Sequence, residues 1–579
     1  MNRIDRAVVG GLILVVILAA VAIGGPALMP TAAPTASPGQ PSAAVAAAPY
    51  REGVLGRPTS INPLAARNGP DRDLVRLVFQ GLAKRDAAGR PVPDLARSWT
   101  STEAGDEWTF SLDPNAYWQD GEPVASGDVL FTIRTIQDPD YHGPGAGSWT
   151  GIQATAVDPL TVRFKLTTPI AGFLDLATQP IVPEHLLADT PPGAMADAAF
   201  GEAPIGSGPY AVTELDRDHA VLEPAAAGRG PATDPAASAA SASPDPLATP
   251  RPTARPTDGP RGLPRLEFRF FDDADALSGA FRDGQLDVAS GLDPAAAIQL
   301  AGTTGATTLR DPATTLAAVA LNLRPSHVEL TDPRVRSALL QAVDRTRIVT
   351  VAYGGGAAQA DGLIPPTSWA YNATNTPALA RDLKAAAKSL TAAGWKKTAG
   401  AWRAPGAKAG QTLDLLVPDR TINPILFAAG SQIAADWTAL GFTVAVHEED
   451  PAVIAADHLR TGDFQAALIE IAIGHDPDLY PLLASSQTRT GAANVIGLQD
   501  PLLDGLLEEA RRPAPDANRI AAFAELQGRL SAETFVLPIA WPDDVVVVSQ
   551  RLTGTSERTV SDDSERFFDV LDWRLADDR

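Results

Sequence analysis

The segment from Trp108 to Ile133 constrains the fold most, because it sets a strand, a tight turn and a helix one after another. Residues 108–112 alternate apolar and polar side chains, as a half-buried strand requires. The dipeptide Asp120-Gly121 readily supplies the positive φ of a tight turn. Ser126 is expected to cap a helix that starts near Asp128, because its oxygen can accept from the first helical amides. A hairpin followed by a helix occurs in many folds, so the order of further motifs decides between them.

Six further motifs follow this segment along the chain. They read PIVPEHLL (180–187), PIGSGPYAV (204–212), DPRVRSALLQAVDRTRIV (332–349), AAGW ending at Trp395, DFQAALIEI from Asp463 and HDPDLYPLL from His475. In this order, and together with the first segment, they resemble the family-5 extracellular solute-binding proteins of ABC transporters, which include the oligopeptide-, dipeptide- and nickel-binding proteins. The resemblance covers about Tyr50 to the C-terminus.

The resemblance implies an α/β, two-lobed periplasmic-binding-protein-like fold of the large, three-domain type, with a hinge between the lobes. Lobe I is expected from three stretches, 50–84, 191–315 and 541–579. Domain II would span 85–190 and lobe III 316–540. The 579 residues agree with this division, because one hydrophobic core rarely serves so long a chain.

The composition narrows the classes of function. The 47 basic and 69 acidic side chains give a net charge of −22. This balance argues against a nucleic-acid partner, because phosphate binding needs a basic surface. The chain has no cysteine, which excludes disulfides, thiolate chemistry and cysteine-based metal sites.

The N-terminal residues 1–29 predict a membrane anchor. Val8 to Leu28 carry no charge and are long enough to span a bilayer, and Arg3 and Arg6 place the N-terminus in the cytoplasm. Residues 30–49, rich in proline and alanine, then form a tether. Without cysteine the chain cannot be a lipoprotein, as many relatives are. The alternative is a signal peptide that is cleaved and a secreted product. The first interpretation places the protein on the extracytoplasmic face of the cell membrane.

A low-complexity insertion at 223–262 predicts a disordered surface loop. Its one large apolar residue, Leu247, buries too little surface to offset the entropy of ordering. The chain reads as strand on both sides, at 219–222 and 266–270, so both strands are expected in lobe I.

The second half reads as helices and strands in alternation. Asp332 and Pro333 mark the start of a helix, whose arginines 334, 336, 345 and 347 are expected mostly on a solvated face. A second helix is expected over Asp382 to Ala393. Residues 413–446 then predict a strand, a helix and a strand, which indicates an α/β lobe with a partly parallel sheet.

No catalytic motif is present. The chain lacks a Gly-x-Ser-x-Gly elbow and a His-Glu-x-x-His helix, and its seven histidines are scattered. We therefore expect no enzyme activity, no cofactor and no metal site. The run His475-Asp476-Pro477-Asp478 is interpreted as a turn with an aspartate cap rather than as an acid/base cluster.

The resemblance places a ligand between the lobes, near hinge crossings at about 315 and 540. The ligand-binding candidates are Leu55, Arg57, Thr59, Gly474, His475, Asp476 and Trp541. Trp541 could form an aromatic pocket wall or pack in the core beneath the hinge.

The sequence leaves the identity of the solute open. Peptide-binding relatives hold the peptide ammonium with an aspartate shortly before a D-P-D-like segment, commonly near a Gly-Trp pair. Here residues 470–475 contain neither the tryptophan nor that aspartate. Asp476 could substitute, or the ligand could lack the ammonium, as a sugar, a modified peptide or a chelate would.

The resulting hypothesis is a monomeric receptor that captures a small solute, most simply a peptide, and delivers it to ABC permease subunits in the membrane. A membrane-anchored solute sensor without a transport role is the first alternative. A secreted hydrolase is the second, disfavoured for want of a catalytic constellation.

Overall fold

The computed structural model describes residues 48–225, 262–407, 410–489, 492–514 and 516–576. The predicted anchor (1–29), most of the tether and residues 226–261 of the insertion lie outside these ranges. Within the described ranges, no helix has both the length and the apolar character that crossing a bilayer requires.

The described residues form a 12-stranded mixed sheet, in the order β18-β17-β19-β13-β20-β11-β1-β10-β9-β8, with β12 and β14 also paired to β20. The strands are β1 (Tyr50–Leu55), β8 (Tyr210–Leu215), β9 (His219–Pro224), β10 (Leu266–Phe271), β11 (Val288–Ser290), β12 (Thr307–Pro312), β13 (Thr315–Leu321), β14 (Ala357–Gln359), β17 (Thr412–Pro418), β18 (Thr443–Glu449), β19 (Ala466–Ala472) and β20 (Val536–Val548).

A smaller antiparallel sheet has the order β4-β5-β7-β6, and short pairs complete the strands. These strands are β2 (Ala83–Arg85), β3 (Pro91–Pro93), β4 (Ala96–Ser101), β5 (Glu107–Leu112), β6 (Ile152–Asp158), β7 (Thr161–Leu166), β15 (Lys396–Thr398), β16 (Ala401–Arg403), β21 (Leu552–Thr553) and β22 (Arg574–Leu575).

The helices are α2 (Gly69–Val78), α3 (Ser126–Gln137), α4 (Phe173–Leu176), α5 (Glu184–Leu187), α6 (Ala274–Arg282), α7 (Pro294–Thr304), α8 (Pro333–Ala342), α9 (Arg345–Val351), α10 (Leu383–Ala392), α11 (Pro424–Leu440), α12 (Pro451–Val453), α13 (Tyr480–Leu483), α14 (Pro501–Arg511) and α15 (Asp516–Glu533). The 3₁₀ helix η6 covers Asp563–Asp572.

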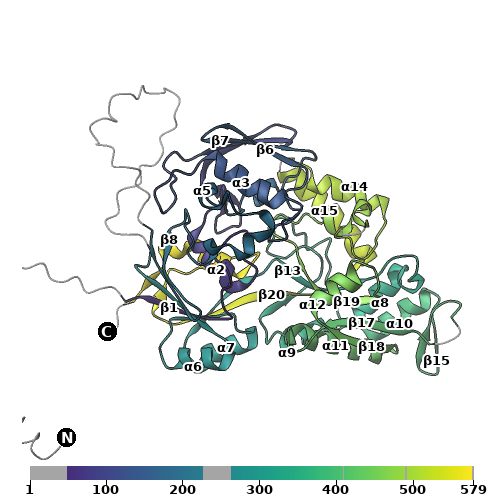
Figure 1. Ribbon diagram of the computed structural model, residues 1–579. Coiled ribbons are helices and arrows are strands. Elements are labelled where there is room, and N and C mark those ends of the chain that lie inside the picture. Colours follow the sequence, from purple (N-terminus) through teal and green to yellow (C-terminus); the bar gives the residue numbers. More distant parts are fainter. Residues whose placement is uncertain (1–47, 226–261, 408–409, 490–491, 515, 577–579) are drawn as a thin grey trace, which may run out of the picture. The chain divides into compact units, whose positions relative to one another are not determined.

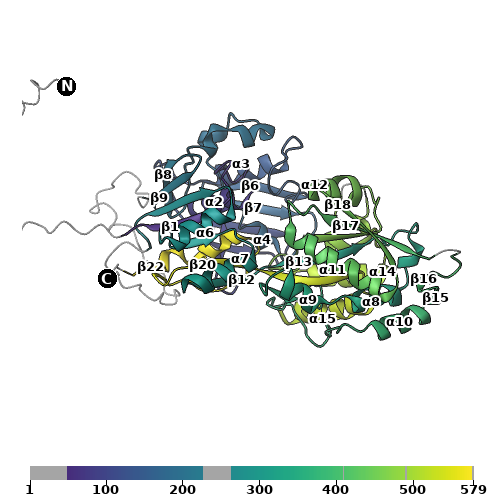
Figure 2. The same cartoon turned by 90° about the horizontal axis from the view of Figure 1, so that it is seen from below.

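Strand β20 joins the two halves of the large sheet. Its first residues, 536–540, pair with β13, and its last residues, 543–548, pair with β12. Both views show β13 and β20 between the group that contains β1 and β8 and the group β17–β19 (Figures 1 and 2). The chain therefore crosses between the halves near 312–315 and near 540–543.

Strand β13 is buried on both faces. Ala317, Val319 and Leu321 pack in one apolar core, with residues of α8, α10 and α11. The alternate residues Leu316, Ala318 and Ala320 pack in another, with residues of α14 and α15. A strand covered on both faces needs apolar side chains at every position, which explains the run TLAAVAL.

Several expected elements are confirmed. The side chains of Trp108, Phe110 and Leu112 alternate inward along β5. β17, α11 and β18 form the predicted strand, helix and strand, and β17 and β18 are parallel. The strands on both sides of the insertion, β9 and β10, pair antiparallel.

The predicted cap at Ser126 is wrong. Helix α3 already includes Ser126, whose hydroxyl donates to the carbonyl of Asp158 at 2.9 Å. Asp128 supplies the capping interaction instead, because its carboxylate accepts from the backbone N–H of Ala125 at 2.9 Å.

The expected solvated face of arginines is also partly wrong. Arg336 and Arg345 are each 2 % exposed. Arg336 donates to the carbonyls of residues 330, 331 and 533, and Arg345 to those of 360 and 379. A guanidinium can be buried here because backbone carbonyls occupy its donors.

Asp311 on β12 and Asp544 on β20 lie opposite each other in the ladder. Asp311 is fully buried; its Oδ1 accepts from the N–H of Arg558, while its Oδ2 has no hydrogen-bond partner among the described residues. Burial raises the pKa of Asp311 to about 6 and that of Asp544 to about 7. The folded chain therefore holds protons that the unfolded chain releases, so stability falls as pH rises from about 4 to about 7.

Asp311→Asn should raise the free energy of unfolding at pH 8 by about 1–2 kcal/mol and flatten its dependence on pH, since one buried titrating group is removed. Urea unfolding at pH 5 and pH 8 measures both effects. Asp457→Asn, at an exposed carboxylate, is the control. An unchanged pH dependence in Asp311→Asn would contradict the assignment.

Candidate functional site

A cavity of about 640 Å³ lies where separate segments of the chain meet. Its walls come from α2 and the residues around it (63–85), from 144–180, from 473–511 and from 561–565. The volume is in the range of small-molecule binding sites. No single segment encloses the cavity, so its shape depends on how the segments are held together.

Helix α2 forms one wall, and its N-terminal end is fixed by hydrogen bonds. Asn68 caps it by accepting from the N–H of Asp71, and Asp71 in turn accepts from the N–H groups of Thr59 and Ser60. Arg72, Val75 and Arg76 line the cavity, at the i, i+3 and i+4 spacing of one helix face.

A buried ion cluster also holds α2, through Asp73. Arg566 of η6 donates to both carboxylate oxygens of Asp73 at 2.7 and 2.6 Å and to Glu52 of β1 at 2.8 Å. Tyr50 donates to the other oxygen of Glu52 at 2.6 Å. Because all of these groups are buried, each charge relies on its partners.

Two contacts cross the cavity from the turn at 474–478. His475 Nε2 lies 2.9 Å from Glu565 Oε2, and the N–H of Asp476 donates to Asp175 Oδ2 at 3.1 Å. Arg85 lies beside both acceptors, 2.8 Å from Asp175 and 3.7 Å from Glu565. These bonds tie the turn to the two other walls.

The carboxylate of Glu565 is ionised in this network. Burial alone would raise its pKa, but the hydrogen bond and charge of His475, with the charge of Arg76, outweigh burial and lower the pKa to about 2.

The acidic side chains of the same turn are already neutralised. Asp476 forms two hydrogen bonds with Arg519, at 2.9 and 2.8 Å. Asp478 accepts from Arg511 at 3.0 Å and from the N–H of Tyr480, and burial raises the pKa of Asp478. Asp478 thus accepts from the first N–H of α13, but the expected aspartate cap is not at the N-cap position, which is Leu479.

The predicted ligand residues fall into two groups. Gly474, His475 and Asp476 line the cavity together. Leu55, Arg57, Thr59 and Trp541 are not among its described lining residues. Whether any of these seven binds a ligand stays a prediction.

Each residue of the second group has a structural partner. Arg57 forms ion pairs with Asp218 and Asp272, and the hydroxyl of Thr59 donates to Asp71. Leu55 packs against a core beside β11. Trp541 is 3 % exposed and packs in the core below β13, while its Nε1 has no hydrogen-bond partner among the described residues.

Sequence reasoning missed Arg72 and Arg76, Asp175 and Glu565, although all four line the cavity. The two arginines had a signal, because they stand one helical turn apart on an amphipathic helix. No local sequence pattern marks Asp175 or Glu565, since only the tertiary fold brings them to His475 and Asp476.

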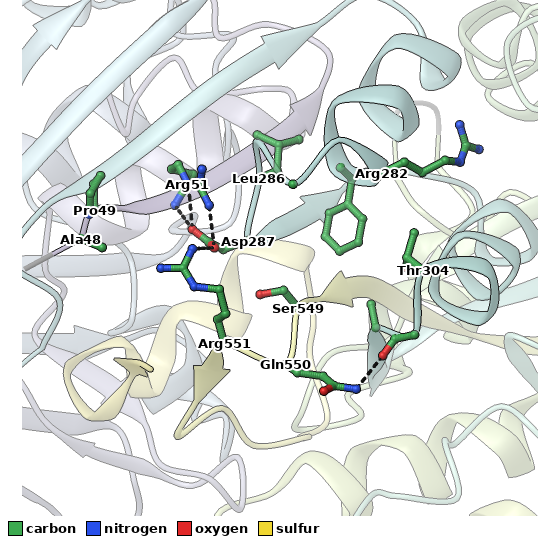
Figure 3. Close-up of a pocket in the computed structure, with 14 residues that line it drawn as sticks. Ala48, Pro49, Arg51, Arg282, Leu286, Asp287, Thr304, Ser549, Gln550 and Arg551 are labelled. Carbon is green, nitrogen blue, oxygen red and sulfur yellow. Dashed lines mark hydrogen bonds and ion pairs between the residues drawn. The ribbon is translucent and has the colours of Figure 1, made fainter. Parts of the chain in front are cut away.

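A second cavity, of about 740 Å³, lies near β1 and the end of β20 and contains no predicted site residue. Figure 3 shows the carboxylate of Asp287 between the guanidinium groups of Arg51 and Arg551, at 3.1 and 3.0 Å. This carboxylate joins neighbouring strand ends, so its role is structural. Within the described ranges, no cluster of acidic and histidine side chains could hold a metal ion.

Comparisons with known proteins agree with this geometry. The chain is 29 % identical to Protein XP55 of Streptomyces lividans over 87 % of this chain and 85 % of that protein. It is 25 % identical to a probable di/tripeptide-binding protein 5 of Pseudomonas aeruginosa, over 83 % and 87 % of the two chains.

A crystal structure with the same fold is that of the ABC transporter substrate-binding protein CtaP of Listeria monocytogenes, with a TM-score of 0.73 and 21 % identity over 92 % of this chain and 100 % of that chain. The model of the bacterial extracellular solute-binding proteins, family 5 (middle), matches residues 90–493. The predicted resemblance is thus confirmed, and the chain belongs to the family-5 bacterial extracellular solute-binding proteins.

Proposed function

We propose that this chain is the extracytoplasmic receptor of an ABC importer, which captures a peptide or similar small solute and delivers it, as a monomer, to permease subunits. The observation that carries the proposal is the cavity of about 640 Å³, whose walls come from separate segments. The names of the relatives, a di/tripeptide-binding protein among them, favour a peptide.

The proposal includes the predicted division into lobe I, domain II and lobe III. The hydrophobic cores support this division, because the two cores that cover β13 consist only of residues from 316–541. The apolar clusters around β1 and β11 contain no residue of 316–540. The crossings near 312–315 and 540–543 would then act as the hinge.

We infer that the solute meets the turn that contains Gly474, His475 and Asp476. The cross-cavity bonds His475–Glu565 and Asp476–Asp175 would hold the lobes in their closed arrangement around it. Closure would hide the solute from water and give the permease a surface that differs from the open form.

We also propose that residues 1–29 remain on the mature protein as its anchor. Mass spectrometry of the native protein from the membrane fraction should then find residues 1–29 intact. A mature N-terminus within residues 31–50, on a freely soluble product, would contradict the anchor and favour secretion.

The function is tested by identifying the solute. The full chain, purified without denaturation, should release a small solute that mass spectrometry can identify, and calorimetry with the stripped protein should return its affinity. Cells that lack the gene should lose uptake of that solute. A stripped protein that binds neither this solute nor any peptide would refute the proposal, and binding without an uptake defect would favour a sensor.

Closure is tested with Glu565→Gln, which removes the charge from the bond to His475. The free energy of unfolding at pH 7 should fall by about 1–3 kcal/mol, the scale of a hydrogen bond to a charged group. Because the folded pKa of Glu565 lies below its ordinary value of 4.5, the difference from the parent should shrink as pH falls from 4.5 toward 2.

Hydrogen exchange supplies the structural readout for this variant. The amides of residues 474–478 should exchange faster in Glu565→Gln than in the parent without ligand. Glu525→Gln, at an exposed carboxylate, is the control and should match the parent. Equal exchange in all three proteins would mean that the bond does not hold the lobes together.

A further inference from the structure

Arg76 lies where two cavities adjoin. It lines the cavity of about 640 Å³ and also a smaller cavity of about 390 Å³, whose wall includes Trp118, Phe567 and Phe568. Arg85, Thr178 and Pro180 are likewise common to both linings. The guanidinium in the last turn of α2 is therefore placed beside both compartments.

The guanidinium of Arg76 forms no hydrogen bond and no ion pair with any residue that the structure describes, although its charge helps to lower the pKa of Glu565. The other arginines at the cavity differ from it in this respect. They pair as Arg72–Asp563, Arg85–Asp175 and Arg511–Asp478. Arg76 is thus a partly buried cation whose donors remain available.

Nearby carboxylates do not fill this role. Glu565 is engaged by His475 and by the N–H of Ser561. Asp94, which lines the smaller cavity of about 390 Å³, accepts from Gln80 at 2.6 Å and lies 3.6 Å from Lys84. Because a guanidinium presents paired donors in a plane, the group that fits it is a bidentate oxyanion such as a carboxylate.

A ligand ammonium finds no comparable receptor in the cavity. Asp175, Asp476, Asp478 and Glu565 are each bound to an arginine or a histidine. Asp562 accepts from the N–H and the hydroxyl of Ser564, and burial raises its pKa. An amine would have to displace a guanidinium, or bind a carboxyl that favours its neutral form. Ile473 lines the same wall and adds no charge.

We propose that Arg76 binds a carboxylate of the solute, and that the solutes are peptides or peptide-like acids whose amino group is acylated or absent. This inference rests on the proposed receptor function and names its ligand class. The carboxylate would lie at the junction, and the rest of the solute would extend into either compartment.

Randomised tripeptides in four forms test the proposal: free at both ends, N-acetylated, C-amidated, and blocked at both ends. The stripped and refolded full chain is mixed with each form, and captured peptides are counted by native mass spectrometry. We expect the two acid forms to be captured, and amidation to weaken capture about 10-fold or more, the scale of a charge-assisted bidentate contact. N-acetylation should strengthen capture or leave it unchanged, because a free ammonium finds no available acceptor among the described residues of the cavity.

Variants at Arg76 assign the effect to this residue. Arg76→Gln should weaken capture of the acid forms about 10-fold or more and leave the amides within about 2-fold, while Arg76→Lys should lie between. Both should fold like the parent, because the guanidinium makes no hydrogen bond to a described residue, and Arg76→Lys should also keep its melting temperature, because it retains the charge that acts on Glu565. Arg97→Gln removes an exposed charge on β4 and should behave like the parent.

The outcomes separate this inference from the receptor function. Capture that needs a free amine, or that is equal in Arg76→Gln and the parent, overturns the role of Arg76 and leaves the receptor intact. If the parent captures none of the four forms, peptide binding fails, and the inference fails with it.

Discussion

The buried guanidinium of Arg566 is the contact on which the cavity depends. It comes from the last part of the chain and binds Asp73 of α2 and Glu52 of β1, so it joins three segments that are far apart in sequence. Removing one partner of a buried ion cluster typically costs about 3–5 kcal/mol, because the other charges remain without compensation. Asp73 also fixes the rotation of α2 about its axis. The face that carries Arg72 and Arg76 is therefore aimed by a contact made one residue along from Arg72, at Asp73.

Much of the fold could be predicted from local patterns. Alternation identified β5, and the apolar run of β17, α11 and β18 identified a partly parallel sheet. The errors arose where a side chain had two possible partners. Ser126 could cap a helix, yet Asp128 does so. Arg336 carries a charge that favours solvent, but the backbone carbonyls of residues 330, 331 and 533 accept hydrogen bonds from it.

The candidate site could be predicted only on one of its walls. The turn at 474–478 was found because its motif is continuous in the sequence and matches the family. Glu565 could not be found, since its pairing with His475 depends on a long-range contact and leaves no local pattern. Leu55, Arg57 and Thr59 were expected to meet the ligand, but Leu55 packs on the core beside β11, Arg57 pairs with Asp218, and Thr59 binds Asp71. The direction of the side chains, rather than their position along the chain, separates the predicted residues that line the cavity from those that do not.

Strand β20 is continuous for 13 residues through both halves of the large sheet. Its ladder with β13 and its ladder with β12 share one backbone, so a sliding motion of one half past the other would break hydrogen bonds along the whole strand. Rotation about the strand axis would keep these hydrogen bonds, because sheets tolerate a range of twist between neighbouring strands. A torsion of this kind would leave the register of β20 unchanged.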